Sequence, residues 1–244
     1  MSENPNSVLI CGESGAGKSA SLRNLRGQEG VLYINCEGGK PLPFKNKFKR
    51  VTIDDPEEIF DLFDQIESNP GRYHTIIIDT ISFMMNRFES VHVLGAHDTM
   101  KQWGVYAQFF PKLCYDYVAK SDCFVIMLGH LDAILDENSG KFSYNVPVKG
   151  ALKKNGLEAY FTTVINCRKL AIKDIKKDSV EGDLLEITDR DANIGYKHVF
   201  QTRTVKSTVG DRIRSPFDLF NDDETYIDND VQIVIDRLKE YYSE

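Results

Sequence analysis

The amino-acid sequence predicts an α/β fold in which a mostly parallel central sheet lies between helices and carries antiparallel edge strands. Three observations support this prediction. An apolar run at 7–11 leads directly into the glycine-rich stretch 12–19, and a second apolar run at 75–78 ends in Asp79. Between and after these runs, strand-like segments alternate with segments of helical periodicity. That alternation is typical of parallel strands joined by crossover helices.

Length and composition indicate one compact unit. The chain has 244 residues, of which 41% are hydrophobic, enough to bury one sizeable core. We therefore predict a single domain over residues 1–244, with its core at about 6–170 and edge strands and a C-terminal helix at 171–244. No apolar run approaches the length of a membrane span, and the N-terminus has no secretion signal. We expect a cytoplasmic protein.

Cysteine spacing and charge exclude some functions. The five cysteines are scattered and never in C-x-x-C spacing, and His92 and His97 are five residues apart, so we expect neither a disulfide framework nor a zinc site. The net charge of −7 does not favour nucleic-acid binding by itself. Basic residues nevertheless gather between 141 and 177.

The stretch 12–19 reads G-x-x-x-x-G-K-S, the Walker A pattern that cradles a nucleotide's phosphates. Its glycines permit the left-handed dihedrals and the close approach that inward-pointing N–H groups require. Lys18 would reach the β- and γ-phosphates, the Ser19 hydroxyl would hold Mg²⁺, and a helix predicted at 20–25 would add its positive end. The predicted nucleotide-binding residues are Gly12, Glu13, Ser14, Gly15, Ala16, Gly17, Lys18, Ser19 and Ala20.

The segment up to Asp79 contributes the first strands. Strands are predicted at 31–35 and 50–53, and a helix opens near Asp55-Pro56, where Asp55 can cap and Pro56 suits the first turn. The run 75–79 is the Walker B pattern. A strand buried on both faces delivers the Asp79 carboxylate at its C-terminal edge, where it can hold Mg²⁺ together with Ser19.

Helices are predicted at 82–93 and 100–120, and we interpret the aromatic stripe of the second as core. A buried strand at 123–129 precedes His130. The polar, glycine-containing stretch 131–149 has no clear periodicity and predicts a mobile loop. The predicted later elements are strands at 159–166, 184–188 and 197–204, and an amphipathic C-terminal helix capped by Asp228 or Asn229.

Hydrolysis of a nucleoside triphosphate needs a carboxylate that orients the attacking water. Thr80, which follows the Walker B aspartate, cannot act as a base. Glu37 comes directly after the strand at 31–35, so it lies on the same sheet edge as the phosphate loop. His130 could sense the γ-phosphate and relay its presence into the following loop. A solvated turn glutamate and a strand-end histidine held by the backbone are the plain alternatives. The predicted catalytic set is Glu37, Lys18 and His130.

Together these features resemble the RecA-type recombinase core: a glutamate after the second strand, a polar residue ending the fourth, and a loop closed by Lys-Gly-Ala-Leu. More narrowly, the chain is similar to phage-encoded AAA/RecA-like ATPases, which include the RecA-like single-strand annealing proteins of the Sak group. The similarity spans about 7–242. Its segments are 12–19, I-N at 34–35, K-P-L-P-F at 40–44, I-I-I-D at 76–79, G-H at 129–130 and S-P-F-D-L-F at 215–220.

The resemblance implies a RecA-like P-loop ATPase that uses ATP and Mg²⁺, forms a homo-oligomeric ring or filament, and assists DNA recombination or strand annealing. Single-stranded DNA and a single-strand-binding protein are the implied partners. Lysines and arginines near the nucleotide edge could displace counterions from DNA phosphates. The candidates for DNA contact are Lys149, Lys153, Lys154, Arg168 and Lys169, and those for reaching a neighbouring copy's γ-phosphate are Lys206 and Arg214.

Other function classes stay open. A non-catalytic ATP-binding assembly or loading factor would leave Glu37 as a turn residue. A small-molecule P-loop kinase ranks lower, because its lid needs arginines and 131–145 has none. A GTPase ranks lowest, because the sequence has no N-K-x-D base-reading motif.

Overall fold

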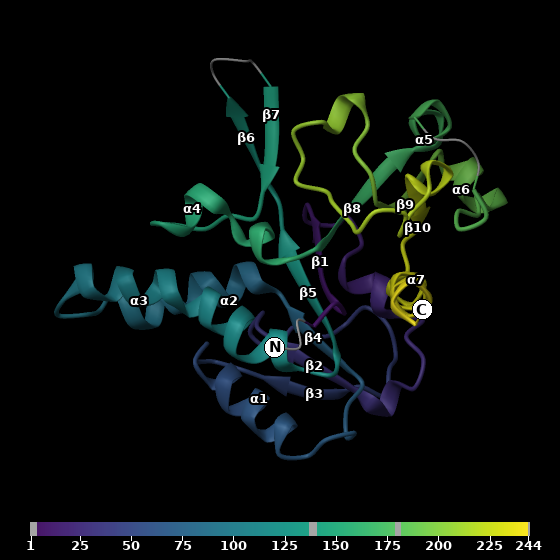
Figure 1. The fold of residues 1–244 in the computed structure, drawn as a ribbon. Coiled ribbons are helices and arrows are strands. Elements are labelled where there is room, and N and C mark those ends of the chain that lie inside the picture. The colour runs from purple at the N-terminus through teal and green to yellow at the C-terminus, as the bar shows by residue number, and fades with distance from the viewer. Residues whose placement is uncertain (1–3, 137–140, 179–181, 244) are drawn as a thin grey trace.

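The computed structural model describes residues 4–136, 141–178 and 182–243. Its centre is an eight-stranded sheet in the order β10-β9-β8-β1-β5-β4-β2-β3 (Figure 1). The strands are β1 Ser7–Gly12, β2 Val31–Asn35, β3 Lys49–Thr52, β4 Thr75–Asp79, β5 Phe124–His130, β8 Thr163–Ala171, β9 Tyr196–Gln201 and β10 Tyr226–Asp228. All neighbours from β8 to β3 are parallel, whereas β9 and β10 are added antiparallel. The predicted α/β P-loop NTPase fold is confirmed.

Hydrophobic side chains from the parallel strands alternate between two core clusters, one on each face of the sheet. Leu9, Ile34 and Ile78 join the cluster that also includes α1 Glu58–Glu67, α2 Ile81–Phe88 and α3 Thr99–Lys112. Ile10 and Ile77 point into the other cluster, which is closed by α7 Val231–Tyr242. Because both faces are covered, the inner strands β1, β2, β4 and β5 have almost uninterrupted apolar sequences.

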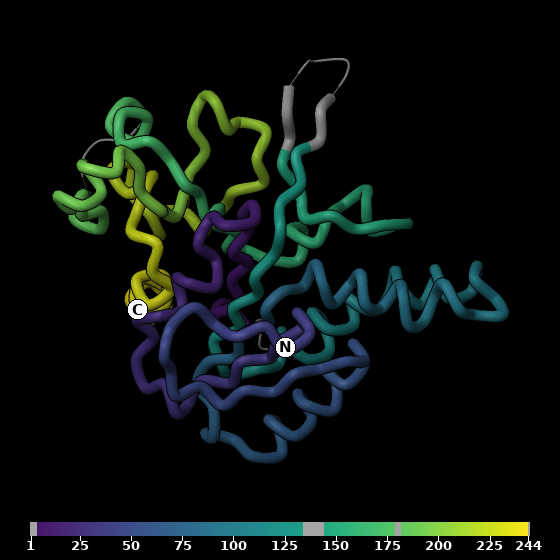
Figure 2. Tube along the Cα trace, turned by 180° about the vertical axis from the view of Figure 1, so that it is seen from behind, coloured from purple at the N-terminus to yellow at the C-terminus, as the bar shows by residue number. Residues whose placement is uncertain are grey.

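The two long helical segments are confirmed, with changes of winding. A π-helical turn over Glu89–Val93 continues α2, and another over Leu113–Tyr117 continues α3. Pro111 lies inside α3 just before the second π turn; it lacks the N–H that a regular α-helix needs there. The aromatic stripe is core as predicted, since Tyr106, Phe109 and Phe110 are buried. The start of α3 extends beyond the sheet (Figure 2).

Two predicted elements near the phosphate loop are wrong. The segment expected to be a helix at 20–25 forms only a short 3₁₀ turn over Ser19–Leu22. The stretch 131–149 contains an antiparallel hairpin rather than an irregular loop, formed by β6 Asp132–Asp136 and β7 Lys141–Asn145. Its residues 137–140 lie outside the described part of the chain. The two hairpin strands pair with each other and form a sheet of their own, separate from the central sheet.

The late part of the chain also differs from prediction. Residues 184–188 form no strand; a single backbone bond joins the Asp228 N–H to the Leu184 carbonyl. The expected strand at 159–166 begins only at Thr163. Asp230, rather than Asp228 or Asn229, caps α7 by accepting the Gln232 N–H. Three short helices complete this part: α4 Leu152–Asn155, α5 Ile172–Asp178 and α6 Asp189–Ile194.

The start of α1 differs from the prediction that Asp55 caps it. Asp55 accepts the Glu57 N–H but lies one turn before the first helical residue, so Glu57 is the N-cap.

Within the described residues, no helix is both long and apolar enough to cross a membrane.

Candidate nucleotide-binding and active site

A cavity of about 690 Å³ lies over the phosphate loop, at the carboxyl ends of the parallel strands. The strand order explains which side chains meet there. Strand β5 lies between β1 and β4, and its last residue His130 stands opposite Gly12 at the end of β1. Strand β2 pairs with β4 so that Asn35 stands opposite Asp79. The cavity therefore brings together the predicted site residues Lys18, Ser19, Glu37, Asp79 and His130.

The glycines of the loop act in different ways. Gly15 and Gly17 have φ of 77° and 108°, in the left-handed region that favours glycine. Gly12 has no positive φ, unlike Gly15 and Gly17. A Cβ atom there would lie 2.6 Å from the Cys167 carbonyl oxygen, so Gly12 is needed for close packing against β8.

Lys18 is buried beneath the loop. Its ammonium group donates to the carbonyl oxygens of Gly12 at 2.7 Å and Glu13 at 2.9 Å, and lies 3.4 Å from His130 Nδ1. Burial lowers the pKa of Lys18, and the nearby acidic groups only partly offset this. Phosphate oxygens are better acceptors for an ammonium group than carbonyl oxygens, so an incoming phosphate can take over these bonds.

The two carboxylate oxygens of Asp79 differ: one accepts hydrogen bonds, and the other, called here the unshared oxygen, accepts none among the described residues. Its Oδ2 accepts the Ser19 hydroxyl at 2.9 Å and the Tyr33 hydroxyl at 2.8 Å. Its Oδ1 is buried without a hydrogen-bond partner in the described residues. Burial raises the pKa of Asp79 despite the lowering effect of both hydroxyls. An unshared buried carboxylate oxygen beside a serine hydroxyl fits Mg²⁺, a hard cation that prefers oxygen ligands.

Glu37 is held on a fixed turn rather than solvated. The Asn35 side chain accepts the N–H groups of Glu37 and Gly39, and the Glu37 side chain is only 9% exposed. Its Oε1 lies 3.4 Å from His130 Nε2, and its Oε2 lies 3.2 Å from Lys40 Nζ. The hydrogen bond with His130 is the largest influence on the pKa of Glu37, which is lowered although burial opposes this.

His130 joins Lys18 to Glu37. An ammonium group has no acceptor, so Nδ1 of His130 must accept from Lys18. The ring proton of neutral His130 is then on Nε2, where it can donate to Glu37. The Ser82 hydroxyl accepts the backbone N–H of His130, which fixes the end of β5. The predicted catalytic residues thus form one connected chain of side chains.

The basic candidates for DNA contact do not form one cluster. Lys149 pairs with the buried Glu89 at 2.8 Å, and Arg168 pairs with the buried Asp211. Lys169 lies 3.8 Å from the centre of the Tyr196 ring. Helix α4 and the carboxyl end of β8 lie on opposite sides of the hairpin (Figures 1 and 2). The α4 candidates are Lys153 and Lys154.

The two candidates for a role in a neighbouring copy differ. Arg214 donates from its guanidinium group to the Glu158 carbonyl oxygen within its own chain. Lys206 is exposed at the start of a 3₁₀ turn, Lys206–Thr208.

One wall of the cavity was missed by sequence reasoning. It comes from α6, β9 and the residues just before α7, far along the chain from the Walker motifs. Lys197 fixes this wall by pairing with Asp191 at 3.2 Å and Asp228 at 3.0 Å. No local sequence pattern marks these residues, because antiparallel pairing in three dimensions brings them to the site. The missed lining residues are Arg190, Asp191, Ile194, Tyr196, Lys197, His198, Asp228 and Asn229.

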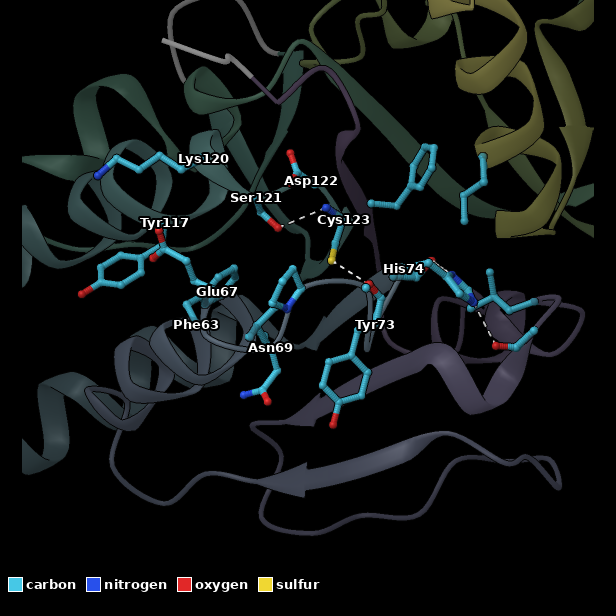
Figure 3. Close-up of a pocket in the computed structure, with 18 of the residues that line it drawn as sticks. Phe63, Glu67, Asn69, Tyr73, His74, Tyr117, Lys120, Ser121, Asp122 and Cys123 are labelled. Carbon is cyan, nitrogen blue, oxygen red and sulfur yellow. Dashed lines mark hydrogen bonds between the residues drawn. The ribbon is translucent and has the colours of Figure 1, made fainter.

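A second cavity of about 690 Å³ lies at the opposite edge of the sheet, where β4 and β5 begin (Figure 3). His74 and Cys123 line it together with Phe63 and Tyr117 from the helical side. His74 is held by contacts with the Gly27 carbonyl and the Thr75 hydroxyl, both at 2.9 Å. This cavity has no phosphate-binding loop, so it is not the nucleotide site.

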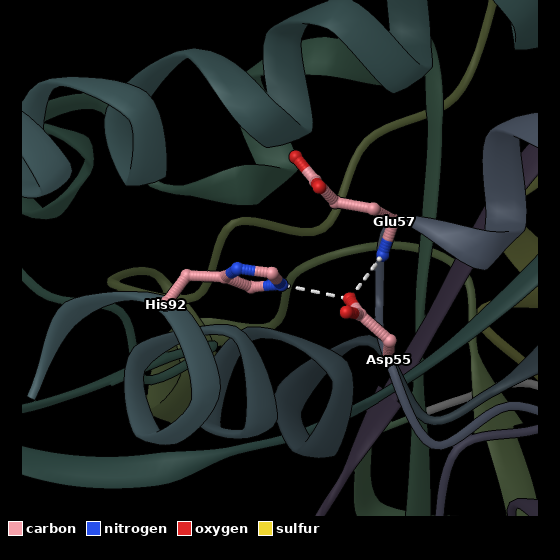
Figure 4. A group of neighbouring side chains, drawn as sticks. All are labelled: Asp55, Glu57 and His92. Carbon is pink, nitrogen blue, oxygen red and sulfur yellow. Dashed lines mark hydrogen bonds and ion pairs between the residues drawn. The ribbon is translucent and has the colours of Figure 1, made fainter. Parts of the chain in front are cut away.

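Asp55, Glu57 and His92 gather near the start of α1 (Figure 4). His92 Nε2 lies 2.7 Å from Asp55 Oδ1, and Glu57 is exposed. Burial raises the pKa of Asp55, but the hydrogen bonds from His92 and from the Glu57 N–H outweigh it and leave that pKa lowered. This group joins α1 to the π turn after α2.

Comparison with known proteins gives one family match. The family described as AAA domain matches residues 4–169, from β1 to the greater part of β8. Among solved structures, a KaiC-like protein from the hyperthermophilic archaeon Pyrococcus horikoshii OT3 is similar with 13% identity and a TM-score of 0.44, over 83% of this chain and 80% of that one. No curated protein matches. The family match stops before the missed wall of the cavity.

Proposed function

The chain belongs to the AAA domain family of P-loop nucleotide-binding proteins, and from this premise we propose that it hydrolyses ATP in an activity directed to single-stranded DNA. One observation carries the hydrolysis proposal. Lys18, the Ser19–Asp79 pair and the connected Glu37–His130 pair all face one cavity at the carboxyl edge of the sheet. Lys18 suits a phosphate chain, the Ser19–Asp79 pair suits a cation, and Glu37 suits an attacking water.

The residues have distinct roles in this reaction. Ser19 and the unshared Asp79 Oδ1 would hold Mg²⁺, which supplies positive charge to the β- and γ-phosphates. Lys18 turns from the loop carbonyls to the γ-phosphate and offsets its charge. Glu37 accepts a proton from the water as the water oxygen attacks the γ-phosphorus and the bond to ADP breaks. Its lowered pKa keeps that carboxylate ionised and ready at neutral pH.

His130 senses whether the γ-phosphate is present. It accepts from Lys18 and donates to Glu37, so movement of Lys18 toward a phosphate changes the contacts of both. The next residue leads into β6, so a shift at His130 reaches the hairpin directly.

The DNA proposal has two supports. The chain resembles phage-encoded RecA-like annealing proteins of the Sak group, and the exposed Lys153 and Lys154 lie on α4, which follows the hairpin. In this proposal the protein acts in the cytoplasm of a phage host as a homo-oligomeric ring or filament. A single-strand-binding protein is a partner, and Lys206 or Arg214 approaches the neighbouring copy's nucleotide.

The first experiment measures ATP hydrolysis with and without single-stranded DNA. We expect DNA to stimulate hydrolysis and Lys18→Ala to abolish nucleotide binding. Glu37→Gln should lower kcat by about 100-fold or more while ATP affinity stays near that of the wild type, because it removes the base but no phosphate ligand.

Glu57→Gln is the matched control, because Glu57 is exposed and outside the cavity; it should leave kcat unchanged. If Glu37→Gln hydrolyses ATP at the wild-type rate, Glu37 is not the base. Bound ATP without DNA-stimulated turnover would instead favour an assembly or loading factor.

A further inference from the structure

We propose that His198 and Asn229, which lie beyond the region matched by the family, are positioning residues that hold the phosphate loop in its nucleotide-binding conformation. This inference rests on the proposed nucleotide-binding function. It assigns the antiparallel edge β9–β10 and the start of α7 a direct part in the site, instead of a purely structural one.

The loop lacks the support that a following α-helix would give. Only a 3₁₀ turn over Ser19–Leu22 follows it. The Ser21 N–H bonds to the Gly17 carbonyl at 3.0 Å, but the next bonds have 3₁₀ spacing, such as that from the Arg23 N–H to the Ala20 carbonyl. A regular α-helix would fix the end of the loop by a continuous ladder of such bonds. Here other parts of the chain must fix it.

Two side chains hold the Ala16 carbonyl oxygen. His198 Nδ1 lies 2.7 Å from it, and since a carbonyl only accepts, the ring nitrogen carries the proton. The Cys167 thiol donates to the same oxygen at 3.1 Å, and the Asn229 amide bonds to that sulfur at 2.9 Å. In a planar trans peptide the C=O and N–H groups point in opposite directions. Fixing the Ala16 carbonyl toward β8 and β9 therefore fixes the direction of the Gly17 N–H, one of the loop's phosphate donors.

Steric contact reinforces these bonds. A Cβ atom on Gly17 would lie 2.9 Å from Asn229 Nδ2 and 3.2 Å from His198 Nδ1, so the loop backbone rests directly on both side chains. The start of α7 also binds the segment after the loop. Arg23 donates to the Asn229 carbonyl at 3.0 Å, and Asn24 donates to Asp230 at 2.6 Å. The second half of the loop and its continuation are thus attached to the C-terminal part of the chain at Ala16, Gly17, Arg23 and Asn24.

Three variants at one position test this proposal. An asparagine amide nitrogen can occupy the place of His Nδ1, whereas a glutamine amide extends to the place of Nε2. We expect His198→Ala and His198→Gln to weaken the binding of a fluorescent ATP analogue about 10-fold, the effect of one lost hydrogen bond, and His198→Asn to stay close to the wild type. His92→Asn is the control, because His92 lies outside the cavity; it should leave affinity unchanged.

The outcomes separate this inference from the proposed function. If the wild type does not bind the analogue, nucleotide binding itself is wrong. If the wild type binds and all three His198 variants bind equally well, the inference is overturned. Equal weakening in all three, including His198→Asn, also overturns it, because the donor at Nδ1 would then not matter. Thermal unfolding of each variant shows whether any loss reflects a folding defect.

Discussion

The two carboxylates of the site are adjusted in opposite directions by their surroundings. The hydrogen bond with His130 leads the lowering of the Glu37 pKa, so this group is ionised well into the acid range. Burial leads the raising of the Asp79 pKa, so this group holds its proton to a higher pH than an ordinary aspartate. Glu37 is therefore deprotonated at neutral pH, the state that a general base requires. Burial makes the ionised Asp79 carboxylate unfavourable unless a cation takes the place of the proton.

The raised pKa of Asp79 predicts a pH dependence of nucleotide binding. As pH falls, protons compete with Mg²⁺ for the Asp79 carboxylate, so Mg²⁺-dependent ATP affinity should begin to weaken above the pH expected for an ordinary aspartate. Fluorescent-nucleotide titrations across this range, with Mg²⁺ and with a chelator, measure the effect. Asp79→Asn should bind more weakly and lose the Mg²⁺-dependent part of the pH profile. An unchanged profile in that variant would contradict a metal-binding role for Asp79.

Single elements differ in how well the sequence reveals them. The strands at 31–35 and 75–79 were predicted to the residue, because burial on both faces leaves an apolar run that ends at polar groups. Among the described residues, β6 and β7 pair with each other and with no strand of the central sheet, although β6 carries a short apolar run at 133–135. Residues 184–188 alternate like a strand, but no strand in the described part of the chain pairs with them, and β10 is only three residues long. Pairing partners, which a single sequence does not show, decided these cases.

The base of the hairpin depends on one buried carboxylate. Glu158 is 1% exposed; it accepts the Val146 N–H at 2.7 Å and the Arg212 guanidinium at 2.9 Å. Glu158→Ala leaves the Val146 N–H without an acceptor and removes the charge partner of Arg212, which keeps only the Asn155 carbonyl, so the free energy of unfolding should fall by about 3 kcal/mol. Urea unfolding measures this. Glu186→Ala, at an exposed position, should change stability by less than about 0.5 kcal/mol. A loss of similar size in both variants would show that the Glu158 contacts contribute little.

At the scale of the whole molecule, the sequence predicts the half of the site that carries motifs. The Walker segments, Glu37 and His130 follow from strand order, because carboxyl ends of parallel strands share one edge. His198 and Asn229 reach that edge only through antiparallel pairing of late strands. The ion pairs of the basic candidates were equally hidden. Whether a lysine is available to DNA depends on partners such as Glu89, which lies 60 residues from Lys149.

In the proposed DNA-binding function, the ion pair that each lysine makes decides whether that lysine is available to a DNA phosphate. The α4 residues Lys153 and Lys154 are exposed, and the structure gives neither an ion pair among the described residues, whereas Glu89 offsets the charge of Lys149. We expect Lys153→Ala/Lys154→Ala to weaken single-stranded DNA binding and to reduce the slope of log affinity against log salt by about 1.4, since each lost phosphate contact removes about 0.7 on a single strand.

Lys149→Ala is the matched control and should leave that slope nearly unchanged. The titrations use a non-hydrolysable ATP analogue, so that turnover does not alter the bound state. The opposite pattern, a smaller slope in Lys149→Ala and none of the expected change in the double variant, would place the DNA away from α4. Because the slope counts displaced counterions, it reports a charge contact with the strand even if a variant also alters the hairpin.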